Sequence, residues 1–489
     1  MRRGTGWMGG AWCGLFALVT FWAGCGPSIA EAPEVDAPRV RVEEQVTGGE
    51  GQTRWVRRSV NVPEREVLGQ GITIDRDDNT IAIGIYKGTP DFGSGPLPPL
   101  AQPDGFNAFL VKYTSEGRLL WACGFGALQV EAGDEPVTLF AQVVTDHRRH
   151  ITIIGNASGP VDFGRGLVPA GPFIVQFDSD GDLRWVRHIP QRTLADRVVL
   201  RELAVDREDH LLVVGSITGR ADFGGGPRTS TGDGAFVAKY TREGGYVWDR
   251  VFDTPDFSSF TGVATDGNNH VYVSGFFRDR ANFGGGTLSG PGTDLAVIAR
   301  FTPSGAHVWS RTLEDVTGVD ERGELRLSNI AVHGNRVVVV GEFRGSIRFA
   351  GRTLTSTRLS RSGLVLAMTR DGEDRWGRTL GFLVQQVRAD LEDDVTVLGI
   401  ALPGEDVGTG PLPATPAHHI FISKFDRVNG VRDWVRTFDA QTVGFASLGV
   451  ARHGEVAVTG GFDAPVDFGT GTIVPSSDFT EAFIFRTFP

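Results

Sequence analysis

Short apolar runs, separated by residues that favour turns, follow one another along most of the chain. The clearest stretch spans residues 260–313, where four such runs lie at residues 262–265, 271–277, 295–301 and 308–313. Runs of this length between turn-forming residues are typical of a small antiparallel sheet. We expect four strands, named A to D in chain order, near residues 260–266, 269–277, 294–301 and 306–313.

Two sequence markers show that this unit recurs. The first is a Trp followed two residues later by Arg, with Cys in place of Arg in one copy; its seven tryptophans are Trp55, Trp121, Trp185, Trp248, Trp309, Trp376 and Trp434, spaced 58 to 67 residues apart. The second is an Asp-Phe-Gly-like triplet that begins at residues 91, 162, 222, 282, 348, 406 and 467. Recurrence at a fixed period is the signature of a repeat architecture.

The two series are out of step at the ends of the chain. Residues 53–60 form a Trp strand with no triplet before it, and residues 482–488 form a strand with no Trp strand after it. Joining the two ends completes a seventh unit, which is how β-propellers close and protect their strand edges. The sequence therefore predicts an all-β fold: a seven-bladed β-propeller of four-stranded antiparallel blades over residues 49–489, closed by pairing the N-terminal strand with the C-terminal blade.

The repeat includes residues 266–275 (DGNNHVYVSG), 282–286 (NFGGG), 236–240 (FVAKY) and 309–311 (WSR). These segments resemble the bacterial SBBP β-propeller repeat. The resemblance covers roughly residues 50–489. It implies a propeller of the kind found in exported, lipoprotein-like surface proteins, and it says little about function because one fold hosts many activities.

The N-terminus has the layout of an export signal. Arg2 and Arg3 precede an apolar stretch at residues 11–23, which is too short for a comfortable membrane span. Ala23-Gly24-Cys25 resembles the bacterial lipobox, although Trp22 stands where an aliphatic residue is usual. We expect residues 1–24 to be a signal peptide, Cys25 to be lipidated and residues 25–48 to be a flexible tether. The alternative is an ordinary secretory signal cut near Ala23.

The net charge and the cysteines bear on the kind of partner and on the presence of disulfides. The net charge is -11 and no basic tract offsets it, so the sequence does not favour a nucleic-acid partner. Cys13 and Cys25 lie in the N-terminal segment and leave Cys123 alone in the body, so we expect no internal disulfide framework.

No motif for catalysis, a cofactor or a metal site emerges from the sequence. The Asp-Phe-Gly triplets lack the partner motifs of a kinase, and we expect each Phe to fill the gap between neighbouring blades. The ten histidines show no zinc-ligand spacing. Asp178, Asp180 and Asp182 have spacings that could suit Ca²⁺, as does the segment that starts at Asp75, but both also suit ordinary hairpin turns.

The Trp-x-Arg marker is the most regular polar feature of the chain. Residues two apart on a strand share a face, so each Arg should lie beside its Trp on the outer strand D. We expect this pair to pack between blades, with the guanidinium stacked on an aromatic ring or paired with a carboxylate. A basic row that captures polyanions is the alternative.

These features favour a binding scaffold on the cell envelope: an outer-membrane lipoprotein or a secreted surface protein, monomeric, without enzymatic activity or cofactors. The expected partner is a surface protein or glycan, with membrane contact only through the lipid anchor. The first alternative is an enzyme that processes extracellular glycans or peptides at the propeller centre, near Asp75, Asp206 and Asp266. The second is a purely structural envelope protein.

Loop lengths predict which face binds. The A–B and C–D turns share one face of the ring, whereas the B–C and D–A connections share the other. The B–C segments are long, as at residues 278–294. Long loops on a rigid scaffold often collect binding residues. We therefore expect binding on the B–C/D–A face, through residues 96–107, 408–418 and 473–481.

Overall fold

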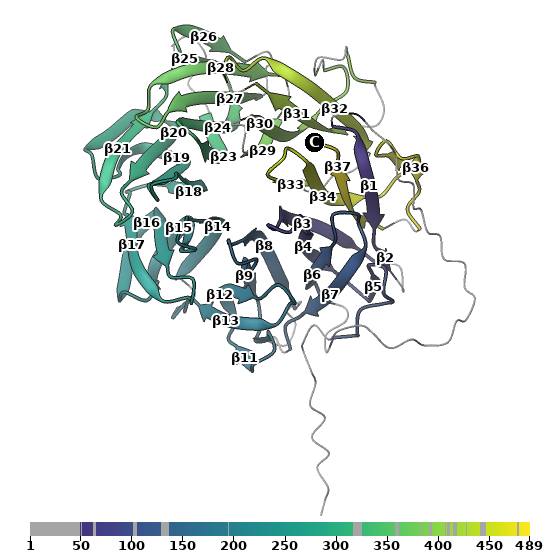
Figure 1. The fold of residues 1–489 in the computed structure, drawn as a ribbon. Helices are drawn as coiled ribbons and strands as arrows, with labels where there is room; N and C mark the ends of the chain where they lie inside the picture. The colour runs from purple at the N-terminus through teal and green to yellow at the C-terminus, as the bar shows by residue number, and fades with distance from the viewer. Residues whose placement is uncertain are drawn as a thin grey trace, which may run out of the picture.

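In the computed structural model, the folded body consists of β-strands joined by turns and short connections (Figure 1). None of the described residues lies in a helix long and apolar enough to cross a membrane. The structure describes residues 49, 51–61, 65–100, 105–128, 136–193, 195–315, 325–356, 361–381, 383–390, 394–405, 407, 411–413, 418–426, 428–440, 446–476 and 479–489.

Seven four-stranded antiparallel sheets form the blades. From the centre outward, blade 1 is β3 (Val67–Ile74), β4 (Thr80–Tyr86), β6 (Asn107–Tyr113) and β7 (Leu119–Phe125), and blade 2 is β8 (Thr138–Thr145), β9 (Ile151–Ala157), β12 (Gly171–Phe177) and β13 (Leu183–His188). Blade 3 is β14 (Arg197–Val205), β15 (Leu211–Asp222), β16 (Pro227–Tyr240) and β17 (Tyr246–Phe252). Blade 4 is β18 (Ser258–Thr265), β19 (Val271–Asn282), β20 (Thr287–Phe301) and β21 (His307–Thr312).

The remaining blades follow the same order. Blade 5 is β23 (Leu325–His333), β24 (Arg336–Phe343), β27 (Ser362–Thr369) and β28 (Asp374–Leu380), and blade 6 is β29 (Leu383–Ala389), β30 (Val395–Ala401), β31 (His418–Phe425) and β32 (Arg432–Ala440). Blade 7 is β33 (Ala446–Val450), β34 (Val456–Phe462), β37 (Glu481–Thr487) and β1 (Thr53–Arg58). Figure 1 shows the first strand of every blade nearest the centre of the ring. The predicted seven-bladed propeller is confirmed.

Blade 7 closes the ring with strands from both ends of the chain. β1 pairs antiparallel with β37, with Val56 opposite Phe485. Beyond the strands, the Phe488 amide donates to the Gln52 carbonyl at 2.7 Å, and the Gly51 amide donates to the Phe488 carbonyl at 3.3 Å. The predicted closure is therefore confirmed, and it buries the edge that β37 would otherwise expose.

The B–C connections differ from the prediction in blade 4. Residues 278–294 were expected to form a long irregular loop, but β19 continues to Asn282 and β20 begins at Thr287, with a register shift between Arg278 and Arg280. The physical reason is a tight turn: the Asn282 side chain accepts the amides of Gly284 at 2.8 Å and Gly286 at 3.3 Å, so the strand ladder continues almost to the tip. β15 and β16 form the same extended hairpin in blade 3.

In blades 1, 2, 5 and 7, the connection between strands B and C belongs to a small separate sheet. The sheets are β2 (Val60–Asn61) with β5 (Pro90–Asp91), β10 (Val161–Asp162) with β11 (Leu167–Val168), β22 (Glu314–Asp315) with β25 (Ser346–Phe349) and β26 (Arg352–Thr355), and β35 (Val466–Asp467) with β36 (Thr472–Ile473).

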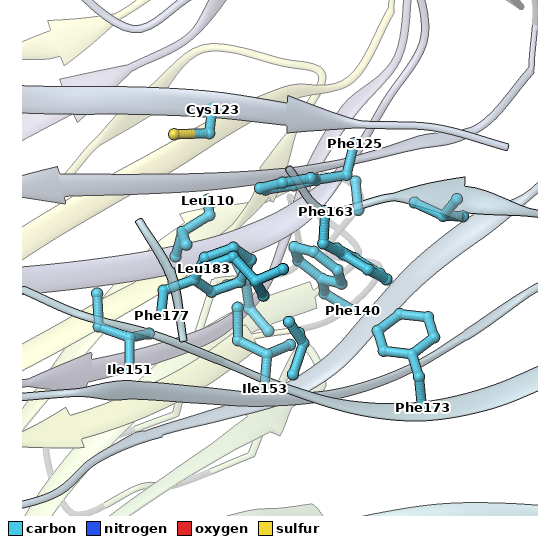
Figure 2. Packing of buried hydrophobic residues seen from close by; sticks show 14 of the residues in the cluster. Leu110, Cys123, Phe125, Phe140, Ile151, Ile153, Phe163, Phe173, Phe177 and Leu183 are labelled. Atoms are coloured by element: carbon cyan, nitrogen blue, oxygen red, sulfur yellow. The ribbon is translucent and has the colours of Figure 1, made fainter. Parts of the chain in front are cut away.

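The Asp-Phe-Gly triplets combine this turn with packing between blades. Asp162 accepts the amides of Gly164 and Gly166, at 2.7 and 3.0 Å, and both glycines have a positive φ, which residues with a side chain rarely adopt. The ring of Phe163 is buried 5.6 Å from Phe125 of blade 1, within the aromatic cluster that Figure 2 shows. The predicted interblade role of the phenylalanine is therefore confirmed.

Cys123, on β7, corrects one expectation about the cysteines. It is disulfide-bonded, and the other cysteine lies outside the described residues. The expectation that Cys123 has no disulfide partner was therefore wrong. It took into account only residues 49–489, whereas both other cysteines lie in the N-terminal segment.

The outer strands lock each blade to the next one. The Trp248 indole N–H of β17 donates to the Pro303 carbonyl in the C–D turn of blade 4, at 3.0 Å. Arg250 Nε donates to the Gly305 carbonyl of the same turn, also at 3.0 Å. Gly305 has a φ of +79°, and a Cβ at this position would lie 2.8 Å from the Trp248 ring. We call this Trp, Arg and turn-glycine contact the interblade lock.

The interblade lock recurs around the ring. The guanidinium lies 5.8 Å from the Trp ring centre in three copies, which confirms the predicted stacking. Arg311 is also paired with a carboxylate, because its Nη1 lies 2.8 Å from Asp374. The partner that recurs for these arginines is a carbonyl of the C–D turn in the next blade, which the sequence did not indicate. The ring–glycine pairs are Trp55 with Gly117, Trp185 with Gly244, Trp248 with Gly305, Trp309 with Gly372, Trp376 with Gly430 and Trp434 with Gly51.

Substituting a lock glycine should destabilise the protein more than its backbone conformation alone explains. Gly305→Ala adds a methyl group against the Trp248 ring, whereas Gly404→Ala adds one at a matched φ of +78° with nothing within 4 Å. The left-handed conformation costs both variants about 1–2 kcal/mol. We expect Gly305→Ala to lose about 1–3 kcal/mol more through overpacking, measured as the difference in urea denaturation. Equal losses in the two variants would show that the Trp ring moves aside freely.

Candidate functional site

In five blades, the A–B turn at the inner end is built on an aspartate. In blade 3, Asp206 Oδ1 accepts the amides of Glu208 and His210, each at 2.9 Å. This side-chain contact replaces a backbone partner and tightens the turn. Equivalent aspartates are Asp75, Asp146, Asp266 and Asp390.

In three blades, a buried lysine neutralises the aspartate of the A–B turn. Lys239 Nζ lies 2.8 Å from Asp206 Oδ2, and both side chains are at most 4% exposed. Lys239 Nζ also reaches the Pro303 carbonyl at 3.4 Å, which is the acceptor of the Trp248 indole in the interblade lock. Removing one partner of such a buried pair typically costs about 3–5 kcal/mol. The corresponding pairs are Lys112 with Asp75 at 2.9 Å and Lys424 with Asp390 at 3.4 Å.

In blade 4, arginines instead of a lysine neutralise the turn aspartate. Arg300 and Arg370 lie 3.8 and 3.7 Å from Asp266 Oδ2. Burial acts to raise the pKa of Asp266, but the His270 and Asn268 amides, followed by the positive charge of Arg370, outweigh it and hold the pKa below its usual value. Asp266 is therefore a stable anion inside the turn.

These contacts occupy the acids that a central enzyme site would need. Asp75, Asp206 and Asp266 lie at the inner turns, as the enzyme alternative expected, but both carboxylate oxygens of each have partners. A general base needs a free lone pair in reach of the substrate proton. The contacts of these three carboxylates stabilise the A–B turns.

The candidate cation ligands are also engaged. Asp178 Oδ1 accepts the amides of Asp180 and Asp182, at 2.9 and 3.0 Å, in the C–D turn of blade 2. In blade 3, ligand atoms of Asp206, Glu208 and His210 lie within 4.8 Å of one another. Lys239 already fills the cationic position beside Asp206, so this cluster does not favour a metal ion.

Two joined cavities open at the A–B turns. The first is about 300 Å³ and the second about 250 Å³, and His147 and Val205 line both. The lining residues are 74–76, 145–147, 205–207, 265–267, 332–334, 370 and 450–452, which come from every blade except blade 6. The cavities therefore surround the ring axis on the A–B/C–D face. We call them the axial mouth.

The axial mouth lies on the face opposite to the one that loop length favoured. Of the expected binding segments, residues 101–104, 408–410, 414–417 and 477–478 lie outside the described residues. Cys25 and the rest of residues 1–48 also lie outside them. The sequence could not indicate the axial mouth because its lining residues are up to several hundred positions apart.

A polar network crosses the ring behind the axial mouth. Asn329 Nδ2 on β23 donates to Glu202 Oε2 on β14 at 2.8 Å, and Arg388 on β29 donates to Asn329 Oδ1 at 2.8 Å. Blades 3 and 5 are not neighbours, so the contact spans the inner edge of blade 4. Glu202 and Asn329 each follow a register shift in their strand, a feature that the sequence does not reveal.

Comparison with known proteins gives one sequence relative. An uncharacterized WD repeat-containing protein of Acanthamoeba polyphaga mimivirus is 30% identical over 245 residues, which is 46% of this chain and 13% of that protein. The chain thus spans only a small part of the relative's length. No protein-family model matches the chain, so the SBBP resemblance stays a prediction. The relative and the seven sheets together support a β-propeller repeat protein.

Solved structures with similar folds are distant. The Dos1 propeller aligns over 89% of this chain and 94% of its own, with a TM-score of 0.39 and 10% identity. The Neurospora crassa Pan2 WD40 domain aligns over 88% and 94%, with a TM-score of 0.40 and 11% identity. A quinohemoprotein alcohol dehydrogenase of Pseudomonas putida HK5 aligns over 89% and 76%, with a TM-score of 0.42 and 9% identity. Scores this low carry no argument about function.

Glu202 should make stability depend on pH. Burial raises its pKa above the usual 4.5, although Arg388, the Leu203 amide and Asn329 act to lower it. The folded state then holds this proton more tightly than the unfolded chain, so the free energy of unfolding should fall as pH rises from about 4.5 through the raised pKa. Each unit of pKa difference corresponds to about 1.4 kcal/mol.

Glu202→Gln removes this titration and keeps an oxygen for Asn329. We expect the variant to lose the decline and to be at least as stable as the wild type at pH 8, measured by urea denaturation from pH 4.5 to pH 8. Glu373→Gln, at an exposed outer turn, is the control and should keep the wild-type profile. A uniform loss of stability for Glu202→Gln at every pH would contradict the assignment.

Proposed function

We propose that the chain is an exported, lipid-anchored cell-surface β-propeller that acts as an interaction scaffold and binds its partner at the axial mouth. The observation that carries the proposal is the pair of joined cavities at the A–B turns. They open on a face that the interblade locks and buried Lys–Asp pairs hold rigidly in place. A rigid scaffold lowers the conformational cost of binding.

The lining of the axial mouth supports binding over catalysis. Its carboxylates are committed to turn amides and to buried cations, as Asp206 is to Lys239. The enzyme alternative places its site in the same position but finds no free acid there among the described residues. The purely structural alternative gives the axial mouth no role.

The cellular setting is part of the proposal. Arg2, Arg3 and the apolar stretch at residues 11–23 support export, and Ala23-Gly24-Cys25 supports lipid attachment. A lipidated Cys25 would hold the propeller at the cell envelope through residues 25–48. Closure of the ring within one chain supports a monomer, and the net charge of -11 supports a partner other than nucleic acid.

Blocking the axial mouth should abolish partner capture. Gly267 lines the first cavity, and its backbone does not require glycine, so Gly267→Trp should fill the cavity. We expect immobilised wild-type protein, residues 26–489, to retain specific proteins or glycans from an envelope extract. Gly267→Trp should reduce that retention at least about tenfold, because the bulky ring excludes the partner.

The matched control places the same side chain on the other face. Thr229 is an exposed residue of β16, near the hairpin tip on the B–C/D–A face. Thr229→Trp should retain the wild-type set of molecules, as identified by mass spectrometry. Loss of capture in Thr229→Trp with capture preserved in Gly267→Trp would return the binding site to the B–C/D–A face.

Removing the lipidated cysteine should release the protein from membranes. Cys25→Ala leaves no thiol at the start of the mature chain, so it should move from the membrane fraction to the soluble fraction. Cys123→Ala, the control, should stay with the membranes. Intact mass should show a mature wild-type chain that begins at Cys25 and carries acyl groups.

Two results would contradict lipid attachment. One is a mature N-terminus elsewhere, with Cys25→Ala still bound to membranes. The other is a mature chain in which Cys25, rather than Cys13, is the disulfide partner of Cys123, because a thioether and a disulfide cannot share one sulfur atom.

A further inference from the structure

The A–B turns place arginines around the axial mouth at a recurring position. The turns of blades 1, 2 and 3 begin with a capping aspartate, and the turn of blade 7 begins with Ala451. In each of these four turns the next residue lines a cavity. In blades 7, 1, 2 and 3, which are consecutive around the ring, the lining residues at this second position are Arg452, Arg76, His147 and Arg207. Together they form an arc of cationic and titratable side chains, which we call the arginine arc.

The guanidinium groups of the arginine arc are not used by the fold. Arg76, Arg207 and Arg452 are exposed, and none of them forms an ion pair with a carboxylate among the described residues. By contrast, the buried Asp206 is neutralised by Lys239 at 2.8 Å. The negative charge of Asp206 is thus compensated by Lys239, whereas the three guanidiniums at the surface have no carboxylate partner among the described residues.

The arginines are close enough to influence one another. Partial desolvation, followed by the positive charge of Arg452, lowers the pKa of Arg76, although Asp209 and Asp146 act to raise it. Two like charges at one cavity wall repel each other, and an anionic ligand would relieve that repulsion. Arg207 is placed by a glycine: its Cζ lies only 3.0 Å from where a Gly267 side chain would begin.

Acidic groups near the arginine arc do not cancel it. Asp209 is buried and accepts the His147 amide at 2.9 Å and its Nδ1 at 2.6 Å. Asp77 pairs with Arg149 at 2.5 Å. Glu208 is exposed on the rim and lies 3.3 Å from His210 Nδ1. The arc therefore keeps a local positive charge on a protein whose net charge is -11.

We propose that the axial mouth binds an acidic peptide segment of a partner protein, with carboxylates held by Arg76, Arg207 and Arg452. The identification rests on the proposed binding function. Three guanidiniums spread over blades 7, 1 and 3 suit several carboxylates along an extended chain better than one compact anion, because each guanidinium can hold one carboxylate through two hydrogen bonds. Among the described residues that line the two cavities there is no Phe, Tyr or Trp, which disfavours stacking of sugar rings.

The test measures binding of a fluorescent hexaglutamate peptide to the protein, residues 26–489, by anisotropy at low salt. We expect the triple variant Arg76→Gln, Arg207→Gln, Arg452→Gln to bind at least about tenfold more weakly, and added salt to weaken wild-type binding. The matched control is Arg165→Gln, Arg280→Gln, Arg352→Gln, which removes the same charge from exposed arginines elsewhere. It should bind within about twofold of the wild type.

Three outcomes would overturn the proposal. One is equal affinity of the wild type and the arginine-arc variant for hexaglutamate. A second is displacement of the peptide by an equal concentration of inorganic phosphate, which would identify a site for a compact anion. The third is tighter binding of polygalacturonate than of hexaglutamate, which would identify an acidic glycan as ligand. If Gly267→Trp still abolishes partner capture in any of these cases, the binding function stands and only the ligand chemistry fails.

Discussion

Contact between the Trp ring of one blade and the turn glycine of the next is the constraint on which this propeller depends. Each sheet packs mainly against its two neighbours, so the stability of the ring depends on the junctions between blades, six of which contain this contact. The indole and the guanidinium satisfy turn carbonyls of the next blade, as Trp248 and Arg250 do for blade 4. The last junction uses Trp434 against Gly51, so the N-terminal segment completes both the strand ladder and the interblade lock.

A buried charge pair connects this junction to the inner turn of the blade. Lys239 reaches the same carbonyl as Trp248 while it neutralises Asp206. Lysine suits this position because a compact ammonium on a flexible stem can meet two acceptors in a narrow space. The chain has only four lysines, and three of them, Lys112, Lys239 and Lys424, occupy this one position. Three of the four lysines thus have the same structural role, which composition alone did not reveal.

The sequence was sufficient for the architecture because the repeat is local. The phase difference between the Trp and Asp-Phe-Gly series predicted the blade number and the closure through residues 53–60. The same reasoning was wrong about residues 278–294, because glycine-rich segments were interpreted as loops when the Asn282 side chain folds them into a tight turn.

The candidate site was beyond the reach of sequence reasoning. Glu202 and Asn329 meet across the ring only because each inner strand shifts register beside them. Arg76 and Arg452 share a cavity although 376 positions separate them, since closure makes blades 1 and 7 neighbours. Periodicity indicates which residues share a strand face, but it does not indicate which turns meet at the axis.

The first two positions of the A–B turn have different roles: the first stabilises the fold, and the second lines the axial mouth. The first position carries the capping aspartate in five blades, where its carboxylate accepts amides of the turn, and it is Ala451 in blade 7. The second position contributes nothing to those contacts, so it can change from blade to blade without loss of the turn. It is Arg in blades 1, 3 and 7 and Gly in blade 4, which makes the mouth cationic along one arc and open beside Gly267. A nearly symmetric ring thereby acquires an asymmetric opening, and a ligand with direction, such as a peptide, can bind it in one orientation.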